Sequence, residues 1–170
     1  SSSAITEQKI VLVAGEDSIP TSYAESGRST GMLVGVVNEA FKRAGYSVEV
    51  FLKPWARCQL EVMLGIVDGI FSIFDTTERQ KFLTYTDEVL INQVQAFFVL
   101  VDSRITFDGD IHKLANNSIG VINLTSYGPR IDDALKNGLF KRVDQAQNSE
   151  NNLRKLLAGR VELIPSYRHV

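Results

Sequence analysis

Near the start of the chain, the spacing of apolar residues changes from that of a strand to that of a helix. Residues 9–14 (Lys-Ile-Val-Leu-Val-Ala) form a compact run of β-favouring side chains that ends at Gly15, where a polar loop begins. From residue 32 to 44 the apolar side chains recur at helical intervals. Gly45 stands where a left-handed C-cap belongs. The pattern predicts a buried strand, a loop and a helix, in that order.

Two further strands and a second helix are predicted before residue 75. Residues 47–52 alternate between apolar and polar side chains, as a half-buried strand does. Pro54 suits the first position of a helix, and the expected inner face of that helix carries Trp55, Gln59, Val62, Met63 and Ile66. Residues 70–74 form a short apolar run, which predicts a third strand.

Residues 75–78 (Asp-Thr-Thr-Glu) have the spacing of a capping box, with Asp75 as the capping residue. A short helix is therefore expected to begin near Thr76 and to carry Arg79 in its first turn. A guanidinium there can hold a carboxylate bidentately while backbone amides help to neutralise it. The alternative is a surface ion pair of Arg79 with Asp75 or Glu78. The residues alone leave both readings open.

A second series of strands and helices follows a polar stretch at 102–110, which itself follows a predicted strand at 94–101. The strands expected in this series are 118–122, 140–143 and 161–164, and the helices are 126–136 and 149–158, the latter closed by Gly159. Alternating strands and helices imply mostly parallel α/β sheets. We therefore expect two lobes, a first, ligand-binding lobe at residues 1–99 and a second lobe at 100–170.

Composition narrows the class of protein. With 170 residues, 44% of them hydrophobic, 22% charged and 4 prolines, the chain is expected to be globular. Its net charge is -2 and its 18 basic residues are dispersed, so nucleic acid is not expected as a partner. No apolar run approaches the roughly 20 residues that cross a bilayer, so a membrane-embedded protein is not expected.

The lone cysteine excludes two further kinds of site. Cys58 cannot form an intramolecular disulfide, and a metal site of paired cysteines is ruled out. The opening Ser1-Ser2-Ser3-Ala4 has neither a basic start nor an apolar core. Any secretion signal is therefore expected to be absent from this chain.

Three loops could carry chemistry, because ligands of parallel sheets bind beyond the carboxyl ends of the strands. These loops are residues 15–23, 74–79 and 123–127. In the last of them Thr125 and Ser126 supply hydroxyls and amides at a predicted helix start, suited to an anionic group, although capping explains them equally well.

Other side chains near these loops are candidates for ligand contact. Trp55 and Tyr23 could form aromatic walls, although an aromatic at helical spacing more often belongs to the core. Arg57 lies in a first helical turn, where a cation is unfavourable to the helix dipole. Either a ligand or an internal carboxylate would explain it.

Catalysis has no positive support in the sequence. His112 and His169 are distant from any Ser or Cys partner, and Cys58 falls mid-helix without a nearby base. No Gly-Lys-Ser/Thr phosphate loop occurs either. We therefore expect neither enzymatic activity nor a cofactor.

The order of motifs resembles that of a known family. The motifs are Gly-Met-Leu-Val-Gly-Val-Val-Asn-Glu-Ala at 31–40, Pro-Trp at 54–55, Gly-Ile-Val-Asp-Gly-Ile-Phe-Ser at 65–72, Thr-Thr-Glu-Arg at 76–79 and Phe-Leu-Thr-Tyr-Thr at 82–86. Looser matches are Ile-Gly-Val at 119–121 and Leu-Ala-Gly-Arg-Val-Glu at 157–162. Together they resemble the amino-acid-type (family 3) periplasmic solute-binding proteins of ABC transporters, with the type II periplasmic binding fold.

The resemblance implies two α/β lobes joined by hinge strands, which close on a ligand in the cleft between them. It implies that Arg79 receives the ligand α-carboxylate and that Ser72 contributes a backbone group. It also implies that Thr125 and Ser126 are the carboxylate contacts of the second lobe. Phe74 and Thr76 belong to the same loop as Arg79, and we count them as ligand contacts. The implied location is the periplasm, and the implied partner is a membrane permease.

Two positions depart from the family pattern. Phe74 stands where a ligand-binding Thr is common, and Tyr167 stands where an acidic residue commonly receives the α-ammonium. The ligand is therefore expected to be a carboxylate without the usual amine, or a modified amino acid. Relatives of this family also continue past the position of Val170. An incomplete chain would expose apolar surface, so a homodimer is possible.

Three function classes follow from the resemblance. The first is capture of a small solute for an ABC permease. The second is a ligand-sensing domain of a signalling receptor, and the third is a rare enzymatic relative of the dehydratase kind. A membrane helix after the chain would favour sensing, and turnover of ligand would favour an enzyme.

Overall fold

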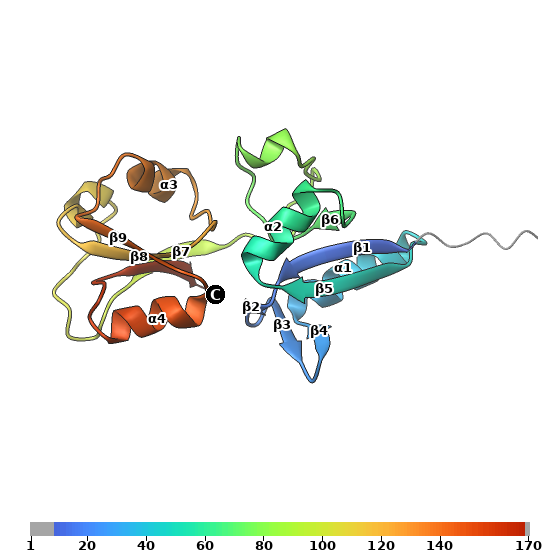
Figure 1. Ribbon diagram of the computed structural model, residues 1–170, viewed down its shortest axis with the longest axis horizontal. Coiled ribbons are helices and arrows are strands. Elements are labelled where there is room, and N and C mark those ends of the chain that lie inside the picture. The colour runs from blue at the N-terminus through green and yellow to red at the C-terminus, as the bar shows by residue number, and fades with distance from the viewer. Residues whose placement is uncertain (1–8, 169–170) are drawn as a thin grey trace, which may run out of the picture. The chain divides into compact units, whose positions relative to one another are not determined.

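The computed structural model describes residues 9–168, and the expectations for Ser1 to Ala4 and His169 lie outside this range. The chain divides into two compact units, Ser1–Leu90 and Ile91–Val170. The fold is mixed α/β with parallel sheets, as the sequence predicts (Figure 1). The lobe boundary at residue 99 stays a prediction.

The first unit is built on a parallel sheet of order β5-β1-β6. The strands are β1 (Ile10–Gly15), β5 (Val48–Lys53) and β6 (Gly69–Ile70). The predictions for β1 and β5 are confirmed to within one residue at each end. The strand predicted at 70–74 is largely wrong, because Ser72 takes a left-handed backbone with φ of 59° and so ends the extended conformation.

Two helices cover this sheet, α1 (Met32–Arg43) and α2 (Trp55–Met63). The crossover through α1 and the return through α2 run in opposite directions across the sheet, so right-handed connections place the helices on opposite faces (Figure 1). The predicted cap of α1 is confirmed. Gly45 has φ of 81°, and the amide of Tyr46 donates to the carbonyl of Phe41.

The predicted inner face of α2 is partly wrong. Cys58 and Glu61 are its buried residues, and Trp55 and Val62 pack partly against the core that Cys58 joins. Met63 is 53% exposed. Hydrophobicity alone favours Met63 over Glu61 as an inner residue, whereas two cations, Lys53 of β5 and Arg57 one turn earlier on α2, make burial of the glutamate tolerable.

The polar loop after β1 contains structure that the sequence did not predict. It folds into a small antiparallel sheet of three strands, β2 (Asp17–Ser18), β3 (Ser22–Glu25) and β4 (Arg28–Thr30). The Ser22 hydroxyl donates to the carbonyl of Gly15 at 2.7 Å and fastens β3 to the end of β1.

The predicted capping box does not form. The segment makes a single 3-10 turn, η1 (Arg79–Lys81), and the side chain of Asp75 accepts instead from the side-chain Nε2 of Gln80 at 2.8 Å. Thr76 makes the kind of bond expected of a capping residue, because its hydroxyl oxygen accepts from the Arg79 backbone amide at 3.3 Å. The helix thus begins later than expected.

In the second unit, β8 (Ser118–Ile122) and β9 (Arg142–Ala146) pair in parallel, and β10 (Ile164–Arg168) and β7 (Val94–Phe98) pair antiparallel. A parallel bridge between Ile119 and Leu163 links the two pairs. The short turn η2 (Ile111–Leu114) precedes β8. The prediction for β8 is confirmed, whereas the last two predicted strands begin two and three residues too early.

Two helices complete this unit, α3 (Pro129–Lys136) and α4 (Ser149–Leu157). The prediction of α4 and its closing Gly159, with φ of 67°, is confirmed. The predicted start of α3 at Ser126 is wrong. Pro129 occupies the first helical turn, and a residue before proline is kept out of the helical region.

The two helices of the second unit pack in separate hydrophobic clusters. Ile119, Val121 and Tyr127 belong to the larger cluster, which also contains Ile131 of α3, and Leu156 of α4 packs in a smaller one. Among residues 9–168, none of the helices is long and apolar enough to cross a membrane.

Candidate functional site

The loops that follow β1, β5 and β6 meet at the carboxyl edge of the first sheet. A Cβ atom added to Gly15, at the end of β1, would lie 3.6 Å from the ring of Trp55, which begins α2. The Arg79 guanidinium carbon lies 5.8 Å from the centre of the same ring, within the range of a cation–π contact. Arg79 therefore belongs to this edge, where parallel sheets bind ligands.

Arg79 is buried, and only 7% of the surface of the residue is exposed. Its Nη1 donates to the carbonyl of Phe74 at 3.0 Å, and its Nη2 donates to the side-chain oxygen of Gln59 at 3.3 Å. Both acceptors are uncharged oxygen atoms, and these two bonds orient the guanidinium. The Phe74 carbonyl also accepts from the Tyr85 hydroxyl at 2.8 Å. Burial raises the pKa of Tyr85.

Two other predicted contacts lie in neighbouring loops of the first unit. Ser72 follows β6 and is half-buried, with the left-handed backbone noted above. Tyr23 is half-buried on β3, opposite Asp17 and Thr30. The structure thus brings together Arg79, Trp55, Phe74 and Thr76, and it places Ser72 and Tyr23 on loops after β6 and β1.

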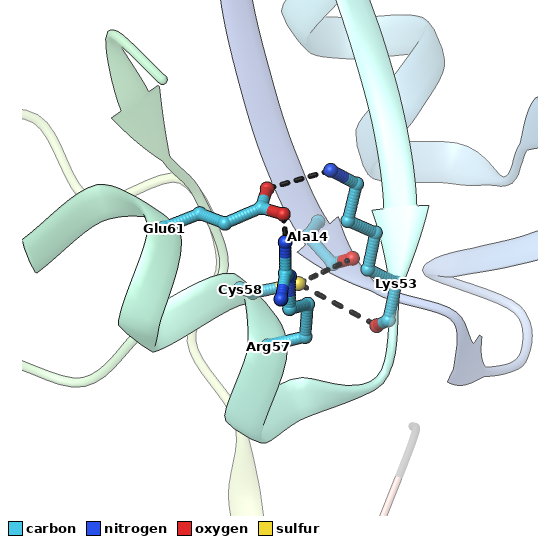
Figure 2. Close-up of polar contacts among 5 residues, drawn as sticks. All are labelled: Ala14, Lys53, Arg57, Cys58 and Glu61. Carbon is cyan, nitrogen blue, oxygen red and sulfur yellow. Dashed lines mark hydrogen bonds and ion pairs between the residues drawn. The ribbon is translucent and has the colours of Figure 1, made fainter. Parts of the chain in front are cut away.

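Arg57 has an internal carboxylate as its partner. Its Nε lies 2.6 Å from Oε1 of Glu61, and Nζ of Lys53 lies 2.6 Å from Oε2 of the same carboxylate (Figure 2). The hydrogen bond from Lys53, followed by that from Arg57, lowers the pKa of Glu61. Of the two explanations for Arg57, the structure supplies the internal one.

Cys58 is fully buried beneath this cluster. Its Sγ donates to the carbonyls of Ala14 at 3.2 Å and Lys53 at 3.4 Å (Figure 2). Burial raises the pKa of the thiol from 9.0 to about 11. Because the thiolate is the nucleophile, this cysteine is chemically inert near neutral pH.

In the second unit, the carboxylate of Asp132 on α3 accepts hydrogen bonds from the loop after β8. The Ser126 hydroxyl donates to Oδ2 of Asp132 at 2.5 Å, and the Tyr127 amide donates to Oδ1 at 2.8 Å. Tyr127 is buried, and its hydroxyl oxygen accepts from the Ile122 amide at 2.8 Å. Burial raises the pKa of Tyr127 to about 12.

Tyr167 joins the same loop. Its hydroxyl donates to the carbonyl of Ser126 at 2.9 Å, so two predicted site residues far apart in the sequence are brought together. Thr125 is half-buried beside them, and its amide donates to the carbonyl of Ile122. Leu124, just before it, has a left-handed φ of 57° and is 56% exposed.

The sequence prediction missed three residues that bond to the predicted site residues. Gln59 lies one helical turn after Trp55 on α2, so the spacing of that face could have indicated its approach to Arg79. Tyr85 and Asp132 gave no signal, because their partners Phe74 and Ser126 come near only in the fold. No cluster of three or more metal-ligating side chains occurs among residues 9–168.

The sequence of the chain is similar to one known family. A sequence model of the bacterial extracellular solute-binding proteins, family 3, matches residues 10–164. No curated protein is similar enough in sequence to count as a match.

Solved structures show the same fold at low sequence identity. The arginine-, lysine-, histidine-binding protein ArtJ from Geobacillus stearothermophilus is 22% identical with a TM-score of 0.78, and the match covers 95% of this chain and 68% of that one. An ancestral arginine-binding protein bound to arginine is 18% identical with a TM-score of 0.77, covering 94% and 70%. The ancestral amino-acid-binding protein AncCDT-1, a precursor of cyclohexadienyl dehydratase, is 19% identical with a TM-score of 0.77, covering 94% and 70%.

Proposed function

The chain belongs to the bacterial extracellular solute-binding proteins of family 3, and from this premise we propose that it captures a small carboxylate-bearing solute in the periplasm for the permease of an ABC transporter. The observation that carries the proposal is Arg79. Its guanidinium is held at the carboxyl edge of the first sheet by neutral oxygen atoms and the Trp55 ring. A fixed guanidinium fork matches the geometry of a carboxylate.

Aromatic side chains supply the rest of the first unit's contacts in this proposal. Trp55 lies against Arg79, and Phe74 and Tyr23 lie in the adjoining loops. Thr76 and Ser72 add a hydroxyl and a backbone group. Aromatic walls favour a ligand with an apolar or planar body next to its carboxylate.

For the second unit we propose Thr125 and Tyr167 as the contacts. The Ser126 hydroxyl is already engaged by Asp132, so its role is to shape the loop. Arg57 has the corresponding role in the first unit, where it holds Glu61. Tyr167 offers a phenol where an acid would receive an ammonium, which supports a ligand without the usual amine.

Calorimetric titration of the full protein against matched acids tests the proposal. The panel pairs each α-amino acid with the same acid lacking the amine and with its uncharged amide. We expect saturable binding of at least one acid and none of its amide, because Arg79 recognises the carboxylate. If amides bind as tightly as acids, Arg79 does not recognise a carboxylate of the ligand. Binding only of acids that carry the amine would leave capture intact and reject the amine-free ligand.

We propose that the ligand is bound without turnover. The likeness to a dehydratase precursor concerns the fold alone, but it makes the enzymatic alternative worth testing. Mass spectrometry of a bound acid after long incubation is expected to recover it unchanged. A new product that forms in proportion to protein concentration would establish an enzyme.

A homodimer is the last element of the proposal. The end of α2 and the turn after it expose Met63, Leu64 and Ile66, at 53%, 60% and 60% of their surfaces. Adjacent apolar side chains of this kind favour association. Sedimentation of the chain over a range of concentrations is expected to show a dimer that Leu64→Glu abolishes. A monomer at every concentration would reject it.

A further inference from the structure

A groove in the second unit is lined by none of the loop residues described above. It has a volume of about 390 Å³ and runs beside α4 and the end of β9. Arg154, Lys155 and Asn151 line it from α4, Gln145 and Gln147 from the end of β9 and the loop after it, and Arg160 from the segment after α4. Its volume falls within the range of about 300–1,000 Å³ that small-molecule sites occupy.

The side chains that line the groove are unusual in their charge. Three of them are cations and three are amides, and none is acidic. The chain as a whole carries a net charge of -2, so this local excess does not reflect its composition. A concave wall of one sign concentrates counter-ions of the opposite sign.

Part of this charge is neutralised by neighbouring acids, and part is not. Arg154 pairs with Glu150 at 2.6 Å, and both side chains are 71% exposed. Lys155 pairs with Asp144 and donates to the Gln145 carbonyl at 2.7 Å. Within residues 9–168, no hydrogen bond or ion pair engages the Arg160 guanidinium.

Several of these cations lie close enough to Asp144 to lower the pKa of its carboxyl group. The hydrogen bond from Lys155 lowers the pKa of Asp144 most, and the charges of Lys155, Arg142 and Arg160 lower it further. Arg142 also donates to the carbonyl of Arg160, which fixes the segment after α4 against β9. Three cations therefore act on one carboxylate, and no ion pair within the described part of the chain joins Arg142 or Arg160 to an acid.

From the groove, its amides and this surplus charge, we propose that the second unit binds a small anion with two or more negative charges, such as a phosphate compound or a polycarboxylate. Arg160 and Arg154 contact its charged groups, and Lys155 supports them from the wall. Gln145, Gln147 and Asn151 offer amide donors that orient the anion. Its lining shares no residue with the proposed solute site, and the proposal does not depend on that site.

A structural use of the same cations must be distinguished from binding. β9 pairs only with β8 among the described strands, and a charged side chain from a covering helix protects such an edge strand from unwanted pairing with other chains. Lys155 at the Gln145 carbonyl fits that use. Edge protection does not require Arg160 or the amides, whereas anion binding does.

Calorimetric titration with inorganic pyrophosphate and with citrate tests the proposal on the full protein. We expect saturable binding of one or both anions at about 0.02 M salt, weakened at about 0.15 M because salt screens exposed charges. Arg160→Gln and Arg154→Gln are each expected to weaken binding by about three- to tenfold, since each removes a charged hydrogen-bond donor. Preference for one anion distinguishes phosphate from carboxylate chemistry.

Arg43→Gln is the matched control. Arg43 pairs with Glu39 of α1 at the same helical spacing as Arg154 with Glu150, and it is similarly exposed. Equal weakening by Arg43→Gln, or binding that never saturates, would overturn the proposal. Tighter binding of a glutamate-rich peptide than of either small anion would overturn it in favour of a protein-docking surface. Arg79→Met is expected to leave anion binding unchanged, which separates this test from that of the solute site.

Discussion

The loops at the strand ends of the two units differ in the groups that accept hydrogen bonds from their donors. In the first unit a buried cation, Arg79, is oriented by the Phe74 carbonyl and the Gln59 side-chain oxygen. In the second unit the donors of Ser126 and Tyr127 are taken by an internal carboxylate, Asp132. A loop that follows a parallel strand can thus hold a cation at the strand end, or its donors can be taken by a carboxylate of the protein itself. We therefore expect the first unit to supply most of the binding free energy of the ligand.

Replacing Arg79 is expected to have the largest effect. Arg79→Met should weaken binding of the acid found by titration by about 100-fold or more, since a charged hydrogen-bond donor to the ligand is lost. Arg79→Lys retains the charge without the fork and should lose less. Calorimetry measures both, and thermal melting confirms that they fold.

Arg43→Met on α1 is the control for this comparison and should bind like the unchanged protein. If Arg79→Met folds and binds the acid with unchanged affinity, the first unit does not recognise the carboxylate through this residue. The contrast between the two loops would then have no functional meaning.

Alkaline unfolding is expected to show the cost of ionising Tyr127. Its pKa is about 12 in the folded protein against 10.0 as the ordinary value. The unfolded phenol loses its proton first, so this stabilisation is complete below pH 10.0 and is lost as the pH rises toward about 12. The loss amounts to about 3 kcal/mol for a shift of this size.

Denaturant titrations at several alkaline pH values measure this loss. Tyr127→Phe cannot ionise and should show a shallower decline above pH 10.0, although it also loses the bond from the Ile122 amide. Cys58, whose pKa is about 11, should contribute a decline in both proteins. An identical alkaline slope for Tyr127→Phe and the unchanged protein would contradict the prediction.

Opening the loop of the second unit is expected to have a moderate effect on stability. Asp132→Ala should lower the free energy of unfolding by about 1–2 kcal/mol, as loss of a capping side chain does. Asp133→Ala is the matched control, because Asp133 is an exposed neighbour on the same helix. Urea denaturation of the two variants checks this, and an equal effect of both would show that Asp132 does not hold the loop.

The smallest effect is expected from Ser126. Ser126→Ala should change ligand affinity by less than about threefold, because its hydroxyl is already bound to Asp132 and removing it costs the ligand no donor. Thr125→Ala should weaken binding more. Calorimetry measures both affinities. A larger loss of affinity in Ser126→Ala than in Thr125→Ala would show that the ligand displaces Asp132 from Ser126, so that both loops would then bond to the ligand directly.

Three strands, β1, β5 and β8, and two of the helices could be predicted because their signals are local. The period of apolar residues located α1 and β8, and a glycine after the last periodic residue located the ends of α1 and α4. The start of α3 is also marked locally, because Pro129 favours the first position of a helix.

The contacts of the site could be predicted only in part. The family resemblance implied Arg79, and the helical spacing of α2 pointed toward Gln59. Nothing local indicated that Asp75 would bond to Gln80 instead of capping a helix. Capping boxes compete with other partners of the same side chain, and the outcome depends on where the chain is held on both sides.

By itself, the sequence determined the alternation of strands and helices, the globular class, and the family in which the chain is found. These follow from the periodicity of apolar residues and from motif order, which need no knowledge of distant contacts. Only the tertiary structure decided that Glu61 would be buried between Lys53 and Arg57, that Tyr167 would reach Ser126, and that Asp132 would close the second loop. The physical reason is that the cost of a buried polar group depends on its partners, and those partners are set by the fold.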